Sequence, residues 1–72
     1  MIRKANISEL SQVKNIVTIA SHCNEEVGVH DECGAIADAK SILGLMSLDY
    51  TKPVCIVSEN TNALESIMRA IS

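Results

Sequence analysis

The sequence predicts an α/β fold of the open-faced type, in which a mostly antiparallel sheet carries helices on one face. Segments with strand and helix periodicity follow one another in the order strand, helix, strand, strand, helix, strand, helix. Hydrophobic residues make up 47% of the 72 residues and Tyr50 is the sole aromatic one, so a single domain over residues 1–72 can build an aliphatic core. Ferredoxin-like folds share much of this order, and the pattern alone leaves them as an alternative.

The N-terminal third predicts a strand over residues 2–7 followed by a helix. Ser8 is the expected N-cap, because its hydroxyl can accept from the free amides of a first turn that begins at Glu9. Glu9 also places a negative charge at the positive end of the helix dipole. Apolar residues then recur three and four positions apart, which predicts one buried helical face: Leu10, Val13, Ile16, Val17, Ala20 and Cys23.

A hairpin follows the first helix. Val27 and Val29 alternate with smaller or polar residues, as in a half-buried strand. Residues 31–34, Asp-Glu-Cys-Gly, form a turn signal, and residues 35–37 can return as the next strand.

The second half predicts a helix, a strand and a final helix. Residues 38–48 contain closely spaced apolar residues, and Gly44 within them indicates close packing or an early end. Pro53 is expected to open a strand over residues 54–58, because proline cannot donate to a strand ladder. Residues 60–62 are expected to be a loop with capping residues. The last helix has its apolar face at Ala63, Leu64, Ile67, Met68 and Ile71.

Charge and composition exclude several classes of function. The net charge is −3, and the six Lys and Arg residues are scattered, so the basic surface of a nucleic-acid-binding protein is missing. No apolar run is long enough for a membrane span. Three cysteines cannot all pair within one chain, and without a targeting signal they predict reduced thiols and a cytoplasmic protein.

One segment resembles a known family. Residues 38–48, Asp-Ala-Lys-Ser-Ile-Leu-Gly-Leu-Met-Ser-Leu, closely resemble the stretch around the regulatory serine of HPr proteins, the phosphocarriers of the bacterial sugar phosphotransferase system. Weaker similarity extends over nearly the whole chain, including Ile19-Ala20-Ser21 and Lys52-Pro53. The resemblance implies the HPr fold: a four-stranded antiparallel sheet with three helices on one face.

The chain departs from the family where HPr proteins carry Gly-X-His-X-Arg-Pro. Glu9 falls near the family's phosphohistidine position and Ser11 near its arginine position. A carboxylate repels a phosphoryl donor and cannot carry out the same transfer. His22 and His30 are the other histidines, and neither is expected at a helix start beside a basic partner. No catalytic residue is therefore predicted.

The resemblance makes Ser41 a candidate for regulatory phosphorylation, although capping of the following helix is an equally good explanation. It also makes Lys40, Ser41, Leu43 and Met46 candidates for partner binding. Leu43 and Met46 are expected to face outwards, because they share one side of the helix. An exposed apolar cluster on a small protein is typical of an interaction site.

No metal or other cofactor is predicted. The His22-Cys23 pair and the His30-x-x-Cys33 motif lack the paired, regular spacing of structural zinc sites. Cys55 has no marked base beside it, as a nucleophile would need. The chain is therefore not expected to be an enzyme.

These features predict a regulatory or protein-interaction module related to the phosphotransferase system, which binds protein partners through residues 41–48. Two alternatives remain open. One is a phosphocarrier that uses an unconventional residue, and the other is a ferredoxin-like domain that senses a small ligand or a metal.

Overall fold

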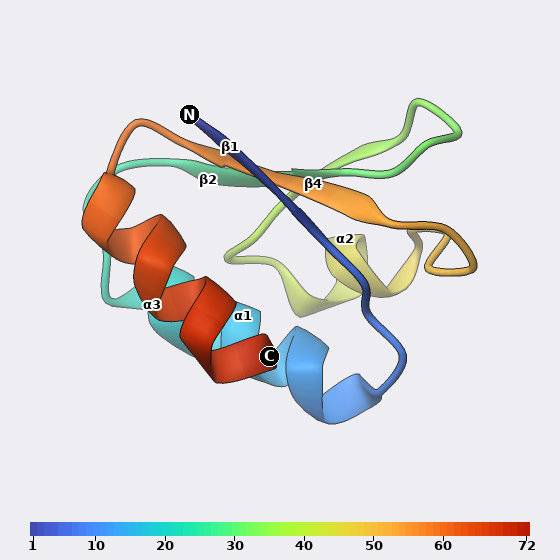
Figure 1. The fold of residues 1–72 in the computed structure, drawn as a ribbon, viewed down its shortest axis with the longest axis horizontal. Coiled ribbons are helices and arrows are strands. Elements are labelled where there is room, and N and C mark those ends of the chain that lie inside the picture. Colours follow the sequence, from blue (N-terminus) through green and yellow to red (C-terminus); the bar gives the residue numbers. More distant parts are fainter.

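A computed structural model describes all residues from Met1 to Ser72. Its four strands form one antiparallel sheet in the order β1-β4-β2-β3 (Figure 1). The elements are β1 (Ile2–Ala5), α1 (Leu10–Ser21), β2 (Val27–His30), β3 (Ile36–Asp38), α2 (Ile42–Met46), β4 (Val54–Ser58) and α3 (Thr61–Ile71). The predicted open-faced sandwich, with a four-stranded antiparallel sheet and three helices, is confirmed.

The central strand β4 shows why the sheet has one covered face. Val54 and Ile56 are fully buried, whereas Cys55 and Val57, which follow them in turn, are half-buried on the other face. This alternation follows from the two-residue period of a strand. The same period on β2 buries Val27 and Val29 beneath the helices.

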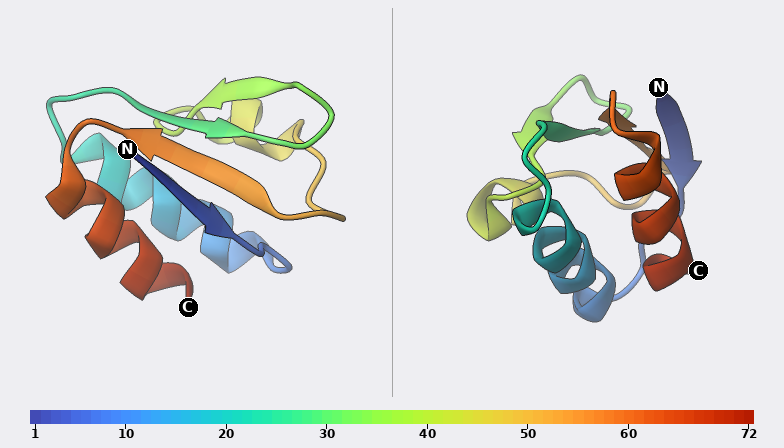
Figure 2. Two further views of the ribbon diagram at one scale, coloured as in Figure 1. Left: turned by 45° about the horizontal axis from the view of Figure 1, so that its top comes forward. Right: turned by 90° about the vertical axis from the view of Figure 1, so that its left-hand side faces the viewer.

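Helices α1 and α3 lie side by side under the sheet, and α2 covers the end near β3 (Figure 2). The Gln12 amide nitrogen of α1 donates to the Ile71 carbonyl of α3 at 2.8 Å. Arg3 of β1 and Glu65 of α3 form an ion pair at 2.9 Å. No helix has the length and apolar character needed to cross a membrane.

The core between sheet and helices is aliphatic, as the composition predicts. The side chains that are fully buried and largest are Ile16, Leu45, Ile56, Leu64, Ile67, Val27, Val29 and Val54. They come from both long helices, from α2 and from the two central strands, so every layer contributes to one core.

The predicted start of the first helix is wrong by one residue. The strand ends at Ala5, and Glu9, not Ser8, is the N-cap of α1. The reason is Gln12, whose side-chain oxygen accepts from the backbone N–H groups of Ser8 and Glu9 at 2.8 and 3.0 Å. Gln12 is thus the third residue of a helix that begins at Leu10, and its side chain reaches back to the backbone N–H of the cap residue Glu9. The helix also ends at Ser21, before Cys23.

The helix predicted over residues 38–48 is also wrong in its bounds, because α2 covers only residues 42–46. Asp38 instead ends β3, and its carboxylate accepts from the Lys40 N–H at 2.9 Å, which forms a turn. Ser41 then caps α2 by accepting from the Gly44 N–H at 3.2 Å. The final helix begins earlier than predicted, at Thr61, because the Asn60 side chain accepts from the Ala63 N–H.

Candidate protein-docking site

Helix α2 presents two large apolar side chains to solvent. Leu43 is 80% exposed and Met46 is 56% exposed, whereas Leu45 is fully buried in the core. The outward direction predicted for Leu43 and Met46 is therefore confirmed. Gly44 lets the helix approach its own cap, since a Cβ there would lie 3.3 Å from the Ser41 hydroxyl oxygen.

The exposed face of α2 continues into a groove beside the start of α1. The groove has a volume of about 440 Å³, and its apolar walls are Ile7, Leu10, Val13, Met46 and Tyr50. Leu10 on the rim is 49% exposed. We call Leu10, Leu43 and Met46, together with this groove, the α2 patch.

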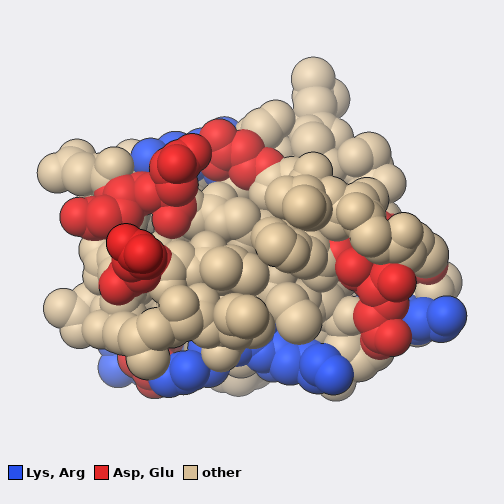
Figure 3. Space-filling view, turned by 90° about the horizontal axis from the view of Figure 1, so that it is seen from above, with Lys and Arg blue, Asp and Glu red and all other residues tan.

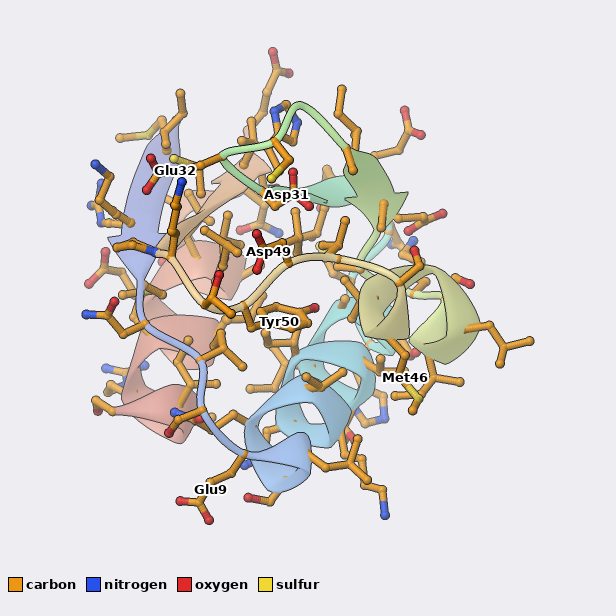
Figure 4. All side chains as sticks on the ribbon, turned by 90° about the vertical axis from the view of Figure 1, so that its right-hand side faces the viewer. Glu9, Asp31, Glu32, Met46, Asp49 and Tyr50 are labelled. Atoms are coloured by element: carbon orange, nitrogen blue, oxygen red, sulfur yellow. The ribbon has the colours of Figure 1, made fainter.

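Tyr50 supports the patch from below. Its hydroxyl donates to the Leu45 carbonyl and so holds the loop after α2 against the end of that helix. Its ring lies between this loop and α1 (Figure 4). Burial raises the pKa of the Tyr50 hydroxyl, which favours the protonated form that donates this hydrogen bond.

The other two candidate partner-binding residues lie just before α2. Lys40 and Ser41 are both exposed, and the Ser41 hydroxyl accepts the capping hydrogen bond. The capping interpretation of Ser41 is therefore confirmed. Because the hydroxyl is at the surface, it is also open to a modifying enzyme.

Glu9 and Ser11 lie at the exposed start of α1, next to the α2 patch. Glu9 points away from the body of the protein (Figure 4). The first turn, Leu10-Ser11-Gln12, contains no basic side chain. A bound phosphoryl group would therefore meet the Glu9 carboxylate without a counter-charge from this turn.

The structure brings neither histidine to the start of a helix. His22 is the C-cap residue of α1 and is exposed. His30 ends β2, with its side chain on the face of the sheet opposite the helices. Both positions agree with the sequence-based expectation for these residues.

The cysteine side chains are free thiols in separate surroundings. Cys23 lies 3.3 Å from a Glu25 carboxylate oxygen, and the Asn60 amide contacts both. The Asn60 hydrogen bond and the Cys23 contact lower the pKa of Glu25. No group of three or more His, Cys, Asp or Glu side chains is arranged to hold a metal ion.

A carboxylate cluster that the sequence analysis missed joins the β2–β3 hairpin to the loop before β4. Asp31 is almost fully buried and accepts from the backbone N–H groups of Cys33, Ala35 and Asp49, each at 2.9 Å. These hydrogen bonds, that of Asp49 first, lower the pKa of Asp31. Asp49 lies beside it (Figure 4) and contacts the Cys33 thiol, whose pKa is raised by this carboxylate. The cluster is structural, because each Asp31 oxygen is used by the backbone.

No protein-family model and no curated protein matches this sequence. Solved structures do match in three dimensions. HPr-C-His from Thermoanaerobacter tengcongensis superposes with a TM-score of 0.81 and 21% identity over 99% of this chain and 90% of its own. The phosphocarrier protein HPr from Bacillus anthracis gives 0.80 and 20% identity over 100% of this chain and 96% of its own.

The chain has the HPr fold.

A third structure with the HPr fold is the catabolite repression protein Crh from Bacillus subtilis. It superposes with a TM-score of 0.71 and 24% identity over 96% of this chain and 83% of its own. That protein is described as an intertwined dimer with a swapping domain. Since most aligned residues differ in all three comparisons, what the chain shares with these HPr-fold proteins is the course of the backbone.

Proposed function

We propose that this HPr-fold chain is a regulatory, protein-binding relative of the phosphocarriers, and that it docks on its partners through the α2 patch. The observation that carries the proposal is the exposure of Leu10 and Met46, which line the groove, and of Leu43, which lies three residues before Met46 on the same helix. Exposing large apolar side chains costs free energy that partner binding recovers. The partners are proteins of the phosphotransferase system or regulators linked to it.

The start of α1 supports a role other than phosphohistidine transfer. The position near the family's histidine holds Glu9, and the position near its arginine holds Ser11. Neither side chain can carry a phosphoryl group between proteins in the way an imidazole does, and the carboxylate repels an incoming phosphoryl donor. The start of α1 can still bind a partner without transferring a phosphoryl group.

Ser41 is the proposed regulatory position. Its exposed hydroxyl precedes Leu43 by two residues, so a phosphate there would lie at the edge of the α2 patch. A phosphate adds about two negative charges and several acceptor oxygens, which can still accept from the Gly44 N–H. Phosphorylation would therefore change the charge of the docking surface without removing the cap of α2.

Binding to the general phosphotransferase enzyme and to an HPr kinase, each from the same source, tests the docking role. Leu43→Glu places a charge in the patch and is expected to weaken binding by about tenfold or more. The matched control is Asn62→Glu, which adds the same charge at an exposed position in the first turn of α3, outside the α2 patch. Equal binding by wild type and Leu43→Glu would contradict the α2 patch as the docking surface.

The kinase also tests Ser41 directly. With ATP, we expect phosphate on Ser41 and none on the Ser41→Ala variant, measured by mass spectrometry of peptides. Ser47 is a second exposed serine at the other end of α2, and Ser47→Ala serves as the matched control. Phosphate that persists in Ser41→Ala would contradict the regulatory position but not the docking surface.

A further inference from the structure

The face of the sheet that the helices leave open presents a regular array of side chains. Two cross-strand rows follow from the register of the four strands. The first row is Lys4, Cys55, His30 and Ile36, and the second row is Ile2, Val57, Gly28 and Asp38. We call these residues the open face.

The middle of the open face is uncharged. Ile36 is 69% exposed and Ile2 is 59% exposed, one on each edge strand. Between them, the surface seen from above is formed by uncharged side chains, with acidic and basic groups gathered towards its borders (Figure 3). An uncharged centre that exposes isoleucine side chains and is bordered by charge is typical of a protein interface.

Gly28 leaves a hollow in this surface. Because it has no side chain, the space above β2 opens into a hollow of about 520 Å³ bordered by His30, Ile36 and Val57. A Cβ at Gly28 would meet its nearest neighbour, the His30 ring, at 3.7 Å, so a methyl group fits there without displacing the chain. A side chain from a second molecule can enter it.

The two charges within the array lie at opposite edges and have opposite signs. Lys4 projects from β1, and Asp38 projects from β3. The chain has one ion pair, between Arg3 and Glu65, so neither Lys4 nor Asp38 is paired within the molecule. One Asp38 oxygen accepts from the Lys40 N–H, and the other has no hydrogen bond.

We propose that the open face binds a second copy of this chain, face to face, about a twofold axis. An axis that lies in the plane of the face, running roughly along the strands, places the β1 edge of one copy over the β3 edge of the other. Lys4 of each copy then lies one row from Asp38 of its partner, about 7 Å along the strand and within reach of the lysine side chain, and both contacts form at once. The uncharged centres of the two sheets pack between these contacts, as in sandwiched sheets about 10 Å apart.

This assembly does not compete with the proposed function. The α2 patch is on the helical side of the sheet, so a dimer formed through the open faces leaves both patches accessible. A dimer would present two docking surfaces at once, which strengthens binding to a partner that has two matching sites. The open-face contact is small, so a weak, concentration-dependent dimer is expected.

The test is sedimentation of the full chain over a wide concentration range, up to about 1 mM. Wild type is expected to form dimers that dissociate on dilution. Val57→Lys, which places two like charges in the centre of the interface, is expected to abolish them. Leu43→Lys on the α2 patch is the matched control and is expected to leave the dimer unchanged.

A charge exchange tests the symmetry. Lys4→Glu alone and Asp38→Lys alone each create two like-charge contacts and are expected to raise the dissociation constant by about tenfold. A mixture of the two variants restores both contacts in a heterodimer, so it is expected to associate as wild type does. Circular dichroism checks that each variant is folded.

Three outcomes would overturn the proposal. One is a wild-type protein that stays monomeric at every concentration. Another is a dimer that Leu43→Lys disrupts and Val57→Lys does not, which would assign association to the α2 patch. The third is a dimer insensitive to Val57→Lys and to both charge reversals, as expected for an exchange of strands between copies. None of them bears on whether Leu43 binds a phosphotransferase-system protein.

Discussion

At the scale of single residues, Asp31 is the side chain on which the loop structure depends most. Its carboxylate accepts three backbone hydrogen bonds, two from its own hairpin and one from Asp49 in the loop before β4. It therefore joins two segments that are 18 residues apart in the chain. Charge-assisted hydrogen bonds of this kind are stronger than neutral ones, and they favour the ionised form.

Replacement of Asp31 is expected to remove part of the acid dependence of stability. The pKa of Asp31 is lowered from 3.8 when the protein folds. The ionised carboxylate therefore stabilises the folded state fully above pH 3.8, and this stabilisation is lost as the pH falls through the lowered pKa of the folded state. Asp31→Asn cannot accept from all three N–H groups, and should lower the thermal midpoint at neutral pH. Its midpoint should also change less than that of wild type between pH 5 and pH 2, a range chosen to span the carboxyl pKa values.

The control for this prediction is Asp38→Asn, because Asp38 accepts one backbone hydrogen bond at the surface. Thermal denaturation of the three proteins across the acid range makes the comparison. An Asp31→Asn variant with the acid sensitivity of wild type would show that other carboxylates are responsible.

The residues of the candidate site differ in how far the sequence predicts them. Helical spacing was enough to predict that Leu43 and Met46 face outwards. The exposure of Leu10 was not predicted, because an apolar residue in the first turn continues the buried spacing of Val13 and Ile16. Asp31 was predicted only as part of a turn, because its partner Asp49 is distant in sequence.

At the scale of elements, the β2–β3 hairpin shows how local residues determine a turn. Gly34 has φ of +93°, a conformation that side chains other than glycine rarely adopt. The Asp31 carboxylate holds the same turn through the Cys33 and Ala35 N–H groups. The residues Asp-Glu-Cys-Gly predicted a turn here, but not the hydrogen bonds that the Asp31 carboxylate makes within it.

Two alanine substitutions are expected to have opposite effects on stability. Gly34→Ala should destabilise the protein by about 1–2 kcal/mol, because alanine is strained at positive φ. Gly28→Ala should stabilise it by about 0.4–1 kcal/mol, since a Cβ there makes ordinary contacts and restricts the unfolded chain.

Urea denaturation of dilute protein measures both free energies of unfolding. Equal effects of the same sign at the two glycines would contradict the role of backbone conformation. The comparison uses one type of substitution in one hairpin region, so differences in side-chain chemistry do not enter.

The bounds of the elements were less predictable than their order, and α2 shows why. Its sequence has apolar spacing over residues 38–48, but the Asp38 and Ser41 side chains bind backbone groups and delay the helix until Ile42. Side-chain caps compete locally with helix formation, and periodicity does not register them. The same competition moved the cap of α1 from Ser8 to Glu9.

At the scale of the whole molecule, a core without phenylalanine or tryptophan must rely on close packing of aliphatic side chains. The cluster that joins sheet and helices consists of Ala, Val, Ile and Leu residues. For a chain of 72 residues the total free energy of unfolding is expected to lie near the lower end of about 5–15 kcal/mol. Each fully buried side chain therefore contributes a large share of it.

Leu64→Ala is expected to destabilise the protein by about 2–5 kcal/mol, because Leu64 is fully buried between α3 and the sheet. Leu43→Ala removes the same atoms from a side chain that is 80% exposed, and should change stability by less than about 0.5 kcal/mol. Denaturant titrations of both variants test the division between core and docking surface. A large effect at Leu43 would show that this residue has a structural role.

The order of strands and helices follows from the sequence, because apolar periodicity, the hairpin signal and Pro53 all predict the same layers. The sheet order β1-β4-β2-β3 does not follow from periodicity, since β1 pairs with β4, the strand most distant from it in the sequence. The resemblance of residues 38–48 to HPr proteins pointed to this fold, and the comparison of structures confirmed it.

The central claim is that a chain with the HPr fold binds partners without carrying phosphate on histidine. The most direct test incubates the protein with the general phosphotransferase enzyme and radiolabelled phosphoenolpyruvate, with an authentic HPr as the positive control. We expect label on HPr and none on this protein. Acid-labile phosphate on this chain that is lost in His22→Ala or His30→Ala would contradict the claim and identify a phosphocarrier.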